Sequence, residues 1–208
     1  PFLLFIITII FSGCNKLTSY KTREITIGNQ VWMLDNLNVD KFNNGDPIPQ
    51  AKTNEEWEKA GENKQPAWCY YDNNPANGEK YGKLYNWYAV NDSRGLAPAG
   101  YHIPRDGEWT QLINYLGGET LAGEKLKSST GWSENGNGTN ESSFSGLPGG
   151  ARLFNGQFAY IGYNGVWWSF TENSPNFARI RLIYCLSSYA YLGNETKRSG
   201  FSVRCVKD

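Results

Sequence analysis

Apolar and polar residues alternate over residues 23–39, REITIGNQVWMLDNLNV, in two runs that meet at Gly28-Asn29. Alternation with a period of two is typical of a strand with one buried face, and a Gly-Asn pair between two such runs favours a tight turn. The pattern therefore predicts a β-hairpin, and we expect the domain to open with β structure.

A short helix is predicted over residues 53–61, TNEEWEKAG. Thr53 stands where an N-cap residue belongs and Glu56 follows three positions later, which is the spacing of a capping box. Gly61 supplies the left-handed residue that ends many helices. We expect about two helical turns between these signals.

The aromatic segment 81–92, YGKLYNWYAVND, carries two competing signals. Leu84, Trp87 and Tyr88 fall on one helical face, whereas the aromatic composition favours a strand almost as strongly. We assign the segment to a helix and keep a strand as the alternative.

Residues 96–118, LAPAGYHIPRDGEWTQLINYLGG, predict an amphipathic helix that ends at Gly117-Gly118. Its apolar stripe has the spacing i, i+3, i+4 and i+7 and consists of Trp109, Leu112, Ile113 and Leu116.

The only histidine, His102, lies just before this helix and close to Asp106 and Glu108. We expect Asp106 to cap the first turn and Glu108 to complement the positive helix end. His102 precedes Pro104 in an extended segment without a neighbouring nucleophile, so we interpret it as structural. The cluster is the entry to a helix and not a catalytic site.

Turn and strand signals alternate through the C-terminal half of the chain. The Gly- and Asn-rich segment 131–143 predicts a loop, and Asn155-Gly156 predicts a hairpin turn within residues 151–162. Further strands are expected over three runs, namely 166–170, 178–185 and 200–208.

The N-terminal run PFLLFIITIIFSGCNK is apolar over about a dozen residues, too few to cross a bilayer core of roughly 30 Å. It is typical of a signal peptide, and Phe11-Ser12-Gly13-Cys14 resembles a bacterial lipobox. We expect a signal peptide truncated at its start over residues 1–13, and a lipidated Cys14 with a tether over 14–23. A buried strand ending in an ordinary cysteine is the alternative.

Composition limits the classes of partner. The 208 residues favour one domain, and 20 basic residues balance 20 acidic ones, so no overall field attracts nucleic acid. Eight Trp, thirteen Tyr and 23 Gly favour short strands, tight turns and long loops. We expect the lipid anchor to make the membrane one partner, with a glycan or an envelope protein as the other.

Cys69, Cys185 and Cys205 remain in what is expected to be an oxidising compartment. One disulfide and one free thiol is the simplest assignment. Cys185 and Cys205 both lie in β-like runs, so we favour that pair over Cys69 with Cys205.

Aromatic side chains in the C-terminal half are candidates for glycan or protein binding, because sugar C–H faces pack on aromatic rings. The candidates are Tyr163, Trp167, Trp168, Tyr189 and Tyr191. Trp167 and Trp168 are adjacent, so on a strand one should point inward and the other outward. A role in the core is the alternative for the tryptophans.

The loop 131–143 offers oxygen ligands for a calcium ion, although loops of this composition are mostly turns. The candidate ligands are Glu134, Asn135, Asn137, Asn140 and Glu141. No other cofactor is expected, because a Cys/His metal site needs more ligands than the chain has and no serine partner for His102 can be identified. Paired carboxylates for glycoside cleavage stay open, since their separation cannot be read from sequence.

Six ordered stretches resemble the Fibrobacter succinogenes major paralogous domain, which is found in envelope proteins of Bacteroidetes and Fibrobacter and has no established activity. The stretches are IGNQVWMLDNLNV, YGKLYNWYAV, GLAPAGYHIPRDGEWTQLINYLGG, GTNESSFSGLPGGARL, WWSFTEN and GFSVRCVKD. The resemblance covers residues 24–208. It implies a cell-envelope, outer-membrane lipoprotein, with the periplasmic or surface face left open.

HIPRDGEW and the closing GF strand are more distantly similar to the formylglycine-generating, sulfatase-modifying enzymes. That similarity implies an α+β, C-type-lectin-like fold with two helices, a small antiparallel sheet, adjoining termini and long irregular loops. Members of the paralogous-domain family commonly have Thr at the position of Arg105, where it would form a capping box with Glu108. Arg105 removes that box, so Asp106 is expected to take over as cap. Many also have a Cys at the position of Ala97, and that bridge cannot form here.

The sequence favours a lipid-anchored, non-catalytic cell-envelope binding or adhesion module, with a glycan as one candidate ligand and a protein as the other. A purely structural envelope protein is the first alternative. An enzyme related to the sulfatase-modifying group is the second, in which the late residues Cys185 and Cys205 would be reactive thiols.

Overall fold

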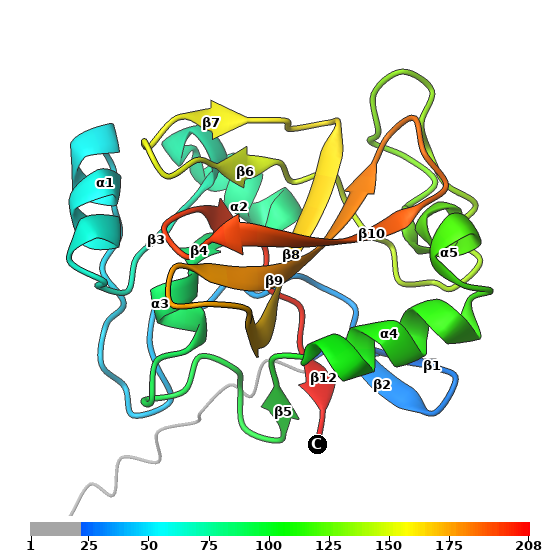
Figure 1. The fold of residues 1–208 in the computed structure, drawn as a ribbon, viewed down its shortest axis with the longest axis horizontal. Helices are drawn as coiled ribbons and strands as arrows, with labels where there is room; N and C mark the ends of the chain where they lie inside the picture. Colours follow the sequence, from blue (N-terminus) through cyan, green and yellow to red (C-terminus); the bar gives the residue numbers. More distant parts are fainter. Residues whose placement is uncertain (1–21) are drawn as a thin grey trace, which may run out of the picture.

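The hairpin predicted at the start of the domain is present (Figure 1). In the computed structural model, which describes residues 22–208, β1 (Glu24–Ile27) pairs antiparallel with β2 (Gln30–Met33). Gly28 turns the chain between them with φ of 63°, a conformation that costs a glycine little. The predicted signal peptide and Cys14 lie outside the described residues.

Both ends of the described chain meet in one sheet. β12 (Val206–Lys207) lies between β2 and β5 (Tyr101–His102) in the order β1-β2-β12-β5. Val206 pairs with Trp32 on one side and His102 on the other. This sheet therefore ties the closing residues to the opening hairpin, as the adjoining termini of the resemblance implied.

Two further antiparallel sheets complete the β structure of residues 22–208. One has the order β10-β9-β8 and consists of β8 (Asn164–Glu172), β9 (Phe177–Tyr184) and β10 (Ala190–Thr196). The other has the order β3-β4-β11-β6-β7 and consists of β3 (Trp68–Cys69), β4 (Leu84–Asn86), β11 (Gly200–Phe201), β6 (Ala151–Arg152) and β7 (Phe158–Ala159). The expected turn at Asn155-Gly156 joins β6 to β7, so that hairpin is confirmed.

The helices lie around these sheets (Figure 1). They are α1 (Asn54–Glu62), α2 (Pro75–Tyr81), α3 (Trp87–Val90), α4 (Asp106–Tyr115) and α5 (Glu119–Leu126), with a 3₁₀ turn over Tyr71–Asn73. The described chain is thus α+β with antiparallel sheets. The resemblance implied two helices and one small sheet, whereas residues 22–208 contain five α-helices and three sheets. Helix α5 lies where the sequence pattern predicted turns and strands.

The capping box of α1 is confirmed. The Thr53 hydroxyl accepts from the Glu56 N–H at 3.1 Å, and the Glu56 carboxylate accepts from the Thr53 N–H at 3.2 Å. The helix runs one residue past Gly61, and the left-handed residue after it is Lys64, with φ of 54°. Gly61 instead packs closely against Arg198, since a Cβ there would lie 3.1 Å from the Arg198 side chain.

The assignment of residues 81–92 to one helix was wrong in its first half. Tyr85 in β4 pairs with Trp68 in β3 and with Phe201 in β11, so this part is a central strand. Asn86 then ends the strand and caps α3, because its side-chain oxygen accepts from the Ala89 N–H at 3.0 Å. The strand signal therefore applies to Leu84–Asn86, and the helix signal applies to Trp87–Val90.

Helix α4 follows the predicted apolar stripe, but Asp106 is not its cap. Arg105 occupies the N-cap position, and the Glu108 carboxylate accepts from its backbone N–H at 2.9 Å. Asp106 is the first helical residue, and its carboxylate pairs at 2.8 Å with the buried guanidinium of Arg181 on β9. Gly117 ends the helix with φ of 102°, as predicted.

Strand β8 runs through the core. Trp167 and Trp168 are 1 % and 0 % exposed, and they belong to different hydrophobic clusters. The Trp167 indole N–H donates to Asn36 Oδ1 at 2.9 Å and that of Trp168 to the Tyr85 carbonyl at 2.8 Å. The two rings do alternate, but both faces of the strand are covered at this point. The expectation that one tryptophan points outward was therefore wrong.

Candidate functional site: a tyrosine face and a polar cavity

One end of the three-stranded sheet carries a connected set of side chains on one face. Leu182 on β9 lies opposite Val166 on β8 and opposite Tyr191 on β10, and Tyr184 lies opposite Asn164. Residues directly opposite each other in an antiparallel pair share a face. The core covers this face at Val166, but Tyr184 and Tyr191 are open to solvent.

Five tyrosines gather at this open end, and we call them the tyrosine face. Each is between 38 % and 54 % exposed, and they are Tyr160, Tyr163, Tyr184, Tyr189 and Tyr191. A hollow of about 430 Å³ lies among Tyr160, Tyr163, Asn164, Leu182 and Tyr184. Large exposed apolar side chains that cluster in this way mark interaction surfaces more often than scattered ones do.

Local contacts fix the orientation of the rings. Tyr189 and Tyr191 stack with their centroids 5.3 Å apart and their planes 17° from parallel. The Tyr191 hydroxyl lies 3.0 Å from the Ser187 hydroxyl, which also accepts from the Tyr189 N–H at 3.1 Å. The stacked pair is thus ordered before any ligand arrives, which lowers the entropy cost of binding.

A strained turn positions the other side of the hollow. Tyr160 has φ of 68°, a left-handed conformation that is unfavourable for a residue with a large side chain. Its carbonyl accepts from the N–H groups of Tyr163 and Asn164 at 3.0 and 2.9 Å. These bonds hold Tyr160 and Tyr163 at the start of β8.

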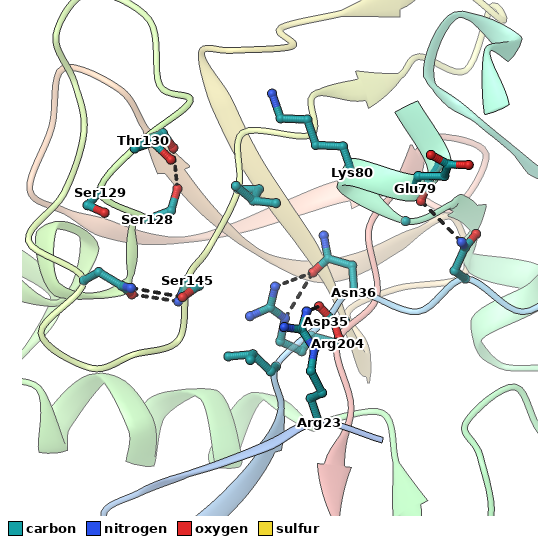
Figure 2. Close-up of a pocket in the computed structure, with 16 residues that line it drawn as sticks. Arg23, Asp35, Asn36, Glu79, Lys80, Ser128, Ser129, Thr130, Ser145 and Arg204 are labelled. Atoms are coloured by element: carbon teal, nitrogen blue, oxygen red, sulfur yellow. Dashed lines mark hydrogen bonds and ion pairs between the residues drawn. The ribbon is translucent and has the colours of Figure 1, made fainter. Parts of the chain in front are cut away.

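A second candidate site is a polar cavity of about 590 Å³ (Figure 2). Charged groups from four segments line it, namely Arg23, Asp35, Glu79, Lys80 and Arg204. Hydroxyl and amide groups complete the lining and include Asn36, Asn38, Ser128, Ser129, Thr130, Asn140 and Ser145. In the close-up, Ser128, Ser129, Thr130 and Ser145 lie on one side, and Asn36 and Arg204 lie together across from them.

The family model of the Fibrobacter succinogenes major domain matches residues 25–207. The chain belongs to this family. The matched range contains all five tyrosines of the tyrosine face and every residue of the polar cavity except Arg23. No curated protein and no solved structure matches the chain.

Three of the five predicted aromatic residues belong to the tyrosine face, namely Tyr163, Tyr189 and Tyr191. Trp167 and Trp168 do not, because they are core residues. Sequence reasoning missed Tyr160 and Tyr184. The position of Tyr184 could have been predicted, because it lies two residues after Leu182 on β9 and so shares its face. The position of Tyr160 depends on a left-handed turn that the sequence pattern does not predict.

The five calcium candidates do not converge on one point. Glu134, Asn135 and Asn137 line a hollow of 250 Å³, Asn140 lines the polar cavity, and Glu141 lies 3.5 Å from Lys125. The side-chain oxygens of Asn137 and Asn140 accept backbone N–H bonds from Trp132 and Ser145. Between residues 22 and 208, no three His, Cys, Asp or Glu side chains gather as a metal site requires.

The expected disulfide between Cys185 and Cys205 is not formed. Both residues and Cys69 are buried free thiols, and the three lie in three different hydrophobic clusters. Burial raises the pKa of the Cys69 and Cys205 thiols to about 12. This shift is opposite in direction to the lowered pKa of reactive thiolates.

His102 lies between two carboxylates beside a cavity of about 520 Å³. Its Nδ1 lies 2.7 Å from Asp208 and its Nε2 lies 2.7 Å from Glu108. Burial by itself lowers the pKa of His102, but hydrogen bonds to the two carboxylates outweigh it, so the pKa is raised. When the ring is protonated, each nitrogen donates to one of the two carboxylates.

Proposed function

We propose that this domain is a non-catalytic binding module of the cell envelope that recognises glycans through the tyrosine face. One observation carries the proposal: three exposed tyrosines, Tyr160, Tyr163 and Tyr184, line a hollow at the end of the three-stranded sheet, and the stacked pair of Tyr189 and Tyr191 belongs to the same open end. Tyrosine rings offer flat apolar surface for sugar C–H groups at a small cost in side-chain entropy.

Polar groups for sugar hydroxyls lie beside these rings. Asn164 lines the hollow, and Ser187 contacts the Tyr191 hydroxyl. A binding site that is mainly aromatic, with a small number of polar groups to orient the ligand, is typical of small-molecule recognition. The tyrosine face has both parts, which favours a glycan over a purely apolar ligand.

The cellular setting belongs to the proposal. We infer that Cys14 is lipidated and that residues 14–23 tether the domain to the outer membrane, with the membrane as its permanent partner. Within the part of the chain that the structure describes, no helix is long and apolar enough to span a bilayer. A lipid anchor would give the domain the membrane attachment that this role needs.

We also propose a C-type-lectin-like arrangement for the α+β fold. The pairing of β12 with β2, which closes the two ends of the domain, supports it. The long stretch between α5 and β6, which contains no strand or helix, supports it as well. The raised pKa of the buried Cys205 thiol supports a binding role over the enzymatic alternative.

The proposal is tested by incubating the full chain with insoluble and immobilised polysaccharides and measuring the bound fraction. A Y189A/Y191A variant should lose most of the binding while its unfolding curve stays unchanged. Y115A is a matched control, because Tyr115 is exposed on α4, outside the tyrosine face. Absence of binding to any glycan would favour the purely structural alternative.

A further inference from the structure

The polar cavity contains a buried cation that no carboxylate contacts within residues 22–208. Arg204 is 1 % exposed. Its Nε and Nη2 donate to the amide oxygen of Asn36 at 3.1 and 2.8 Å, and its Nη1 donates to the Phe144 carbonyl. Figure 2 shows the two bonds to Asn36. All three acceptors are neutral, so among residues 22–208 the positive charge has no direct counterion.

Burial of a charge without a partner is costly, and the pKa of Arg204 shows it. Burial lowers this pKa to about 9, although the charge of Asp35 opposes the shift. Asp35 itself is bound by Arg23, whose Nε donates to Asp35 Oδ2 at 2.9 Å. An anion that enters the cavity would therefore act as the counterion that the described residues do not provide for Arg204.

Arg204 also retains donor capacity. A guanidinium has five N–H groups, and the three recorded bonds leave two of them without an acceptor among the described residues. The Asn36 oxygen already accepts from Trp167 as well, so it has no room for more. A planar anion such as a carboxylate matches the fork of donors that a guanidinium presents.

Other charges in the lining select the kind of anion. Lys80 is exposed and makes no ion pair within the described chain, and its ammonium lies 4.8 Å from the Tyr81 ring. Asp35 and Glu79 also line the cavity and would repel a doubly charged phosphate more strongly than a single carboxylate.

The remaining lining fits a ligand rich in hydroxyl groups. Ser129 and Thr130 lie beside Ser128, whose hydroxyl donates to the Thr130 carbonyl at 2.7 Å, and Ser145 accepts from Asn140 at 3.0 Å. These short polar side chains form the wall opposite Arg204 (Figure 2). A volume of about 590 Å³ is within the range of small-molecule pockets.

We propose that the polar cavity binds a sugar acid, a uronate unit whose carboxylate pairs with Arg204 while its hydroxyls bond to the Ser and Thr wall. Lys80 attracts the anion at the rim. This cavity shares no lining residue with the hollow of the tyrosine face, so the proposal does not rest on the role of that face.

The test is a titration of the full chain with galacturonate and glucuronate, followed by NMR or calorimetry, with galactose and glucose as neutral counterparts. The acids should bind and the neutral sugars should not. Added salt should weaken binding, since the interaction is charged. Equal binding of acid and neutral sugar, or binding of neither, would overturn the proposal.

Two variants place the binding in the cavity. K80A should weaken uronate binding about threefold or more, whereas K59A, which removes an exposed lysine on α1, should leave it unchanged. R204Q should abolish binding, but a folding defect would make K80A the deciding variant. An unchanged affinity in K80A, or loss of uronate binding in Y189A/Y191A, would contradict this assignment.

Discussion

Tyr191 on β10 lies directly opposite Leu182 on β9, and this pairing joins two aromatic groups into one surface. On one side of it is the stacked pair of Tyr189 and Tyr191. On the other is the hollow between Tyr163 and Tyr184. The register of the sheet fixes Tyr184 and Tyr191. Tyr160, Tyr163 and Tyr189 lie outside the strands, where turn hydrogen bonds and the stacking on Tyr191 position them.

Trp168 is a core residue, so its replacement should destabilise the fold and should not remove a direct ligand contact. Its ring is 0 % exposed, packs edge-on against Phe201 at 4.8 Å and donates to the Tyr85 carbonyl. W168A should lower the free energy of unfolding by about 3–5 kcal/mol, measured by urea denaturation. Y163A should change it by less than about 0.5 kcal/mol. Equal effects of the two variants would contradict the assigned burial.

The three described cysteines should behave as protected thiols. In the native, unreduced chain, Cys69, Cys185 and Cys205 should react slowly with an aromatic disulfide reagent, because all three are buried. All three should react after unfolding without reductant. Recovery of only one of these thiols after unfolding, identified by peptide mapping, would show that two of them form a disulfide.

His102 should give the domain a pH-dependent contribution to stability. Its pKa is raised in the folded state because Glu108 and Asp208 accept from its ring. The contribution should be complete below its ordinary pKa of about 6.5 and should disappear as pH rises through the higher folded value. Since the side chain is 40 % exposed, solvent screening limits the effect to about 1 kcal/mol or less.

The measurement is the melting temperature of wild type and H102Q between about pH 5 and about pH 9, a range that extends on both sides of the ordinary histidine pKa of about 6.5. The difference between the two proteins should be largest at the acidic end and vanish at the alkaline end. A difference that is constant across this range would mean that His102 stabilises the fold only by packing.

The capping box of α1 should contribute about 1 kcal/mol to the free energy of unfolding. T53A removes the hydroxyl that accepts from the Glu56 N–H, so the first turn loses one of its partners. T120A is the control, because Thr120 is exposed within α5 and caps nothing. Chemical denaturation should show a loss for T53A and no loss for T120A. An equal loss in both would reflect a general effect of replacing threonine.

Elements defined by local chemistry were predictable from the sequence. The hairpin at Gly28, the box at Thr53 and the helix stop at Gly117 depend on residues a few positions apart, and all three are present. Asp106 was misassigned because Arg181, which is far away in the sequence, pairs with its carboxylate.

The candidate sites depend on tertiary packing, which the sequence pattern does not contain. The alternation of Trp167 and Trp168 predicted opposite directions, but not that core would cover both faces of β8. The polar cavity brings Arg23, Lys80 and Arg204 together from opposite ends and the middle of the chain. No motif links these residues, so only the folded chain reveals the cavity.

The tyrosine face is tested most directly by calorimetric titration with a soluble oligosaccharide of a polysaccharide that the wild-type chain retains. Y189A/Y191A should bind it at least about tenfold more weakly, because each lost ring contact is worth roughly 1 kcal/mol. Y115A should bind like wild type, and all three proteins should share one unfolding midpoint. Equal affinity of the double variant and wild type would contradict the account.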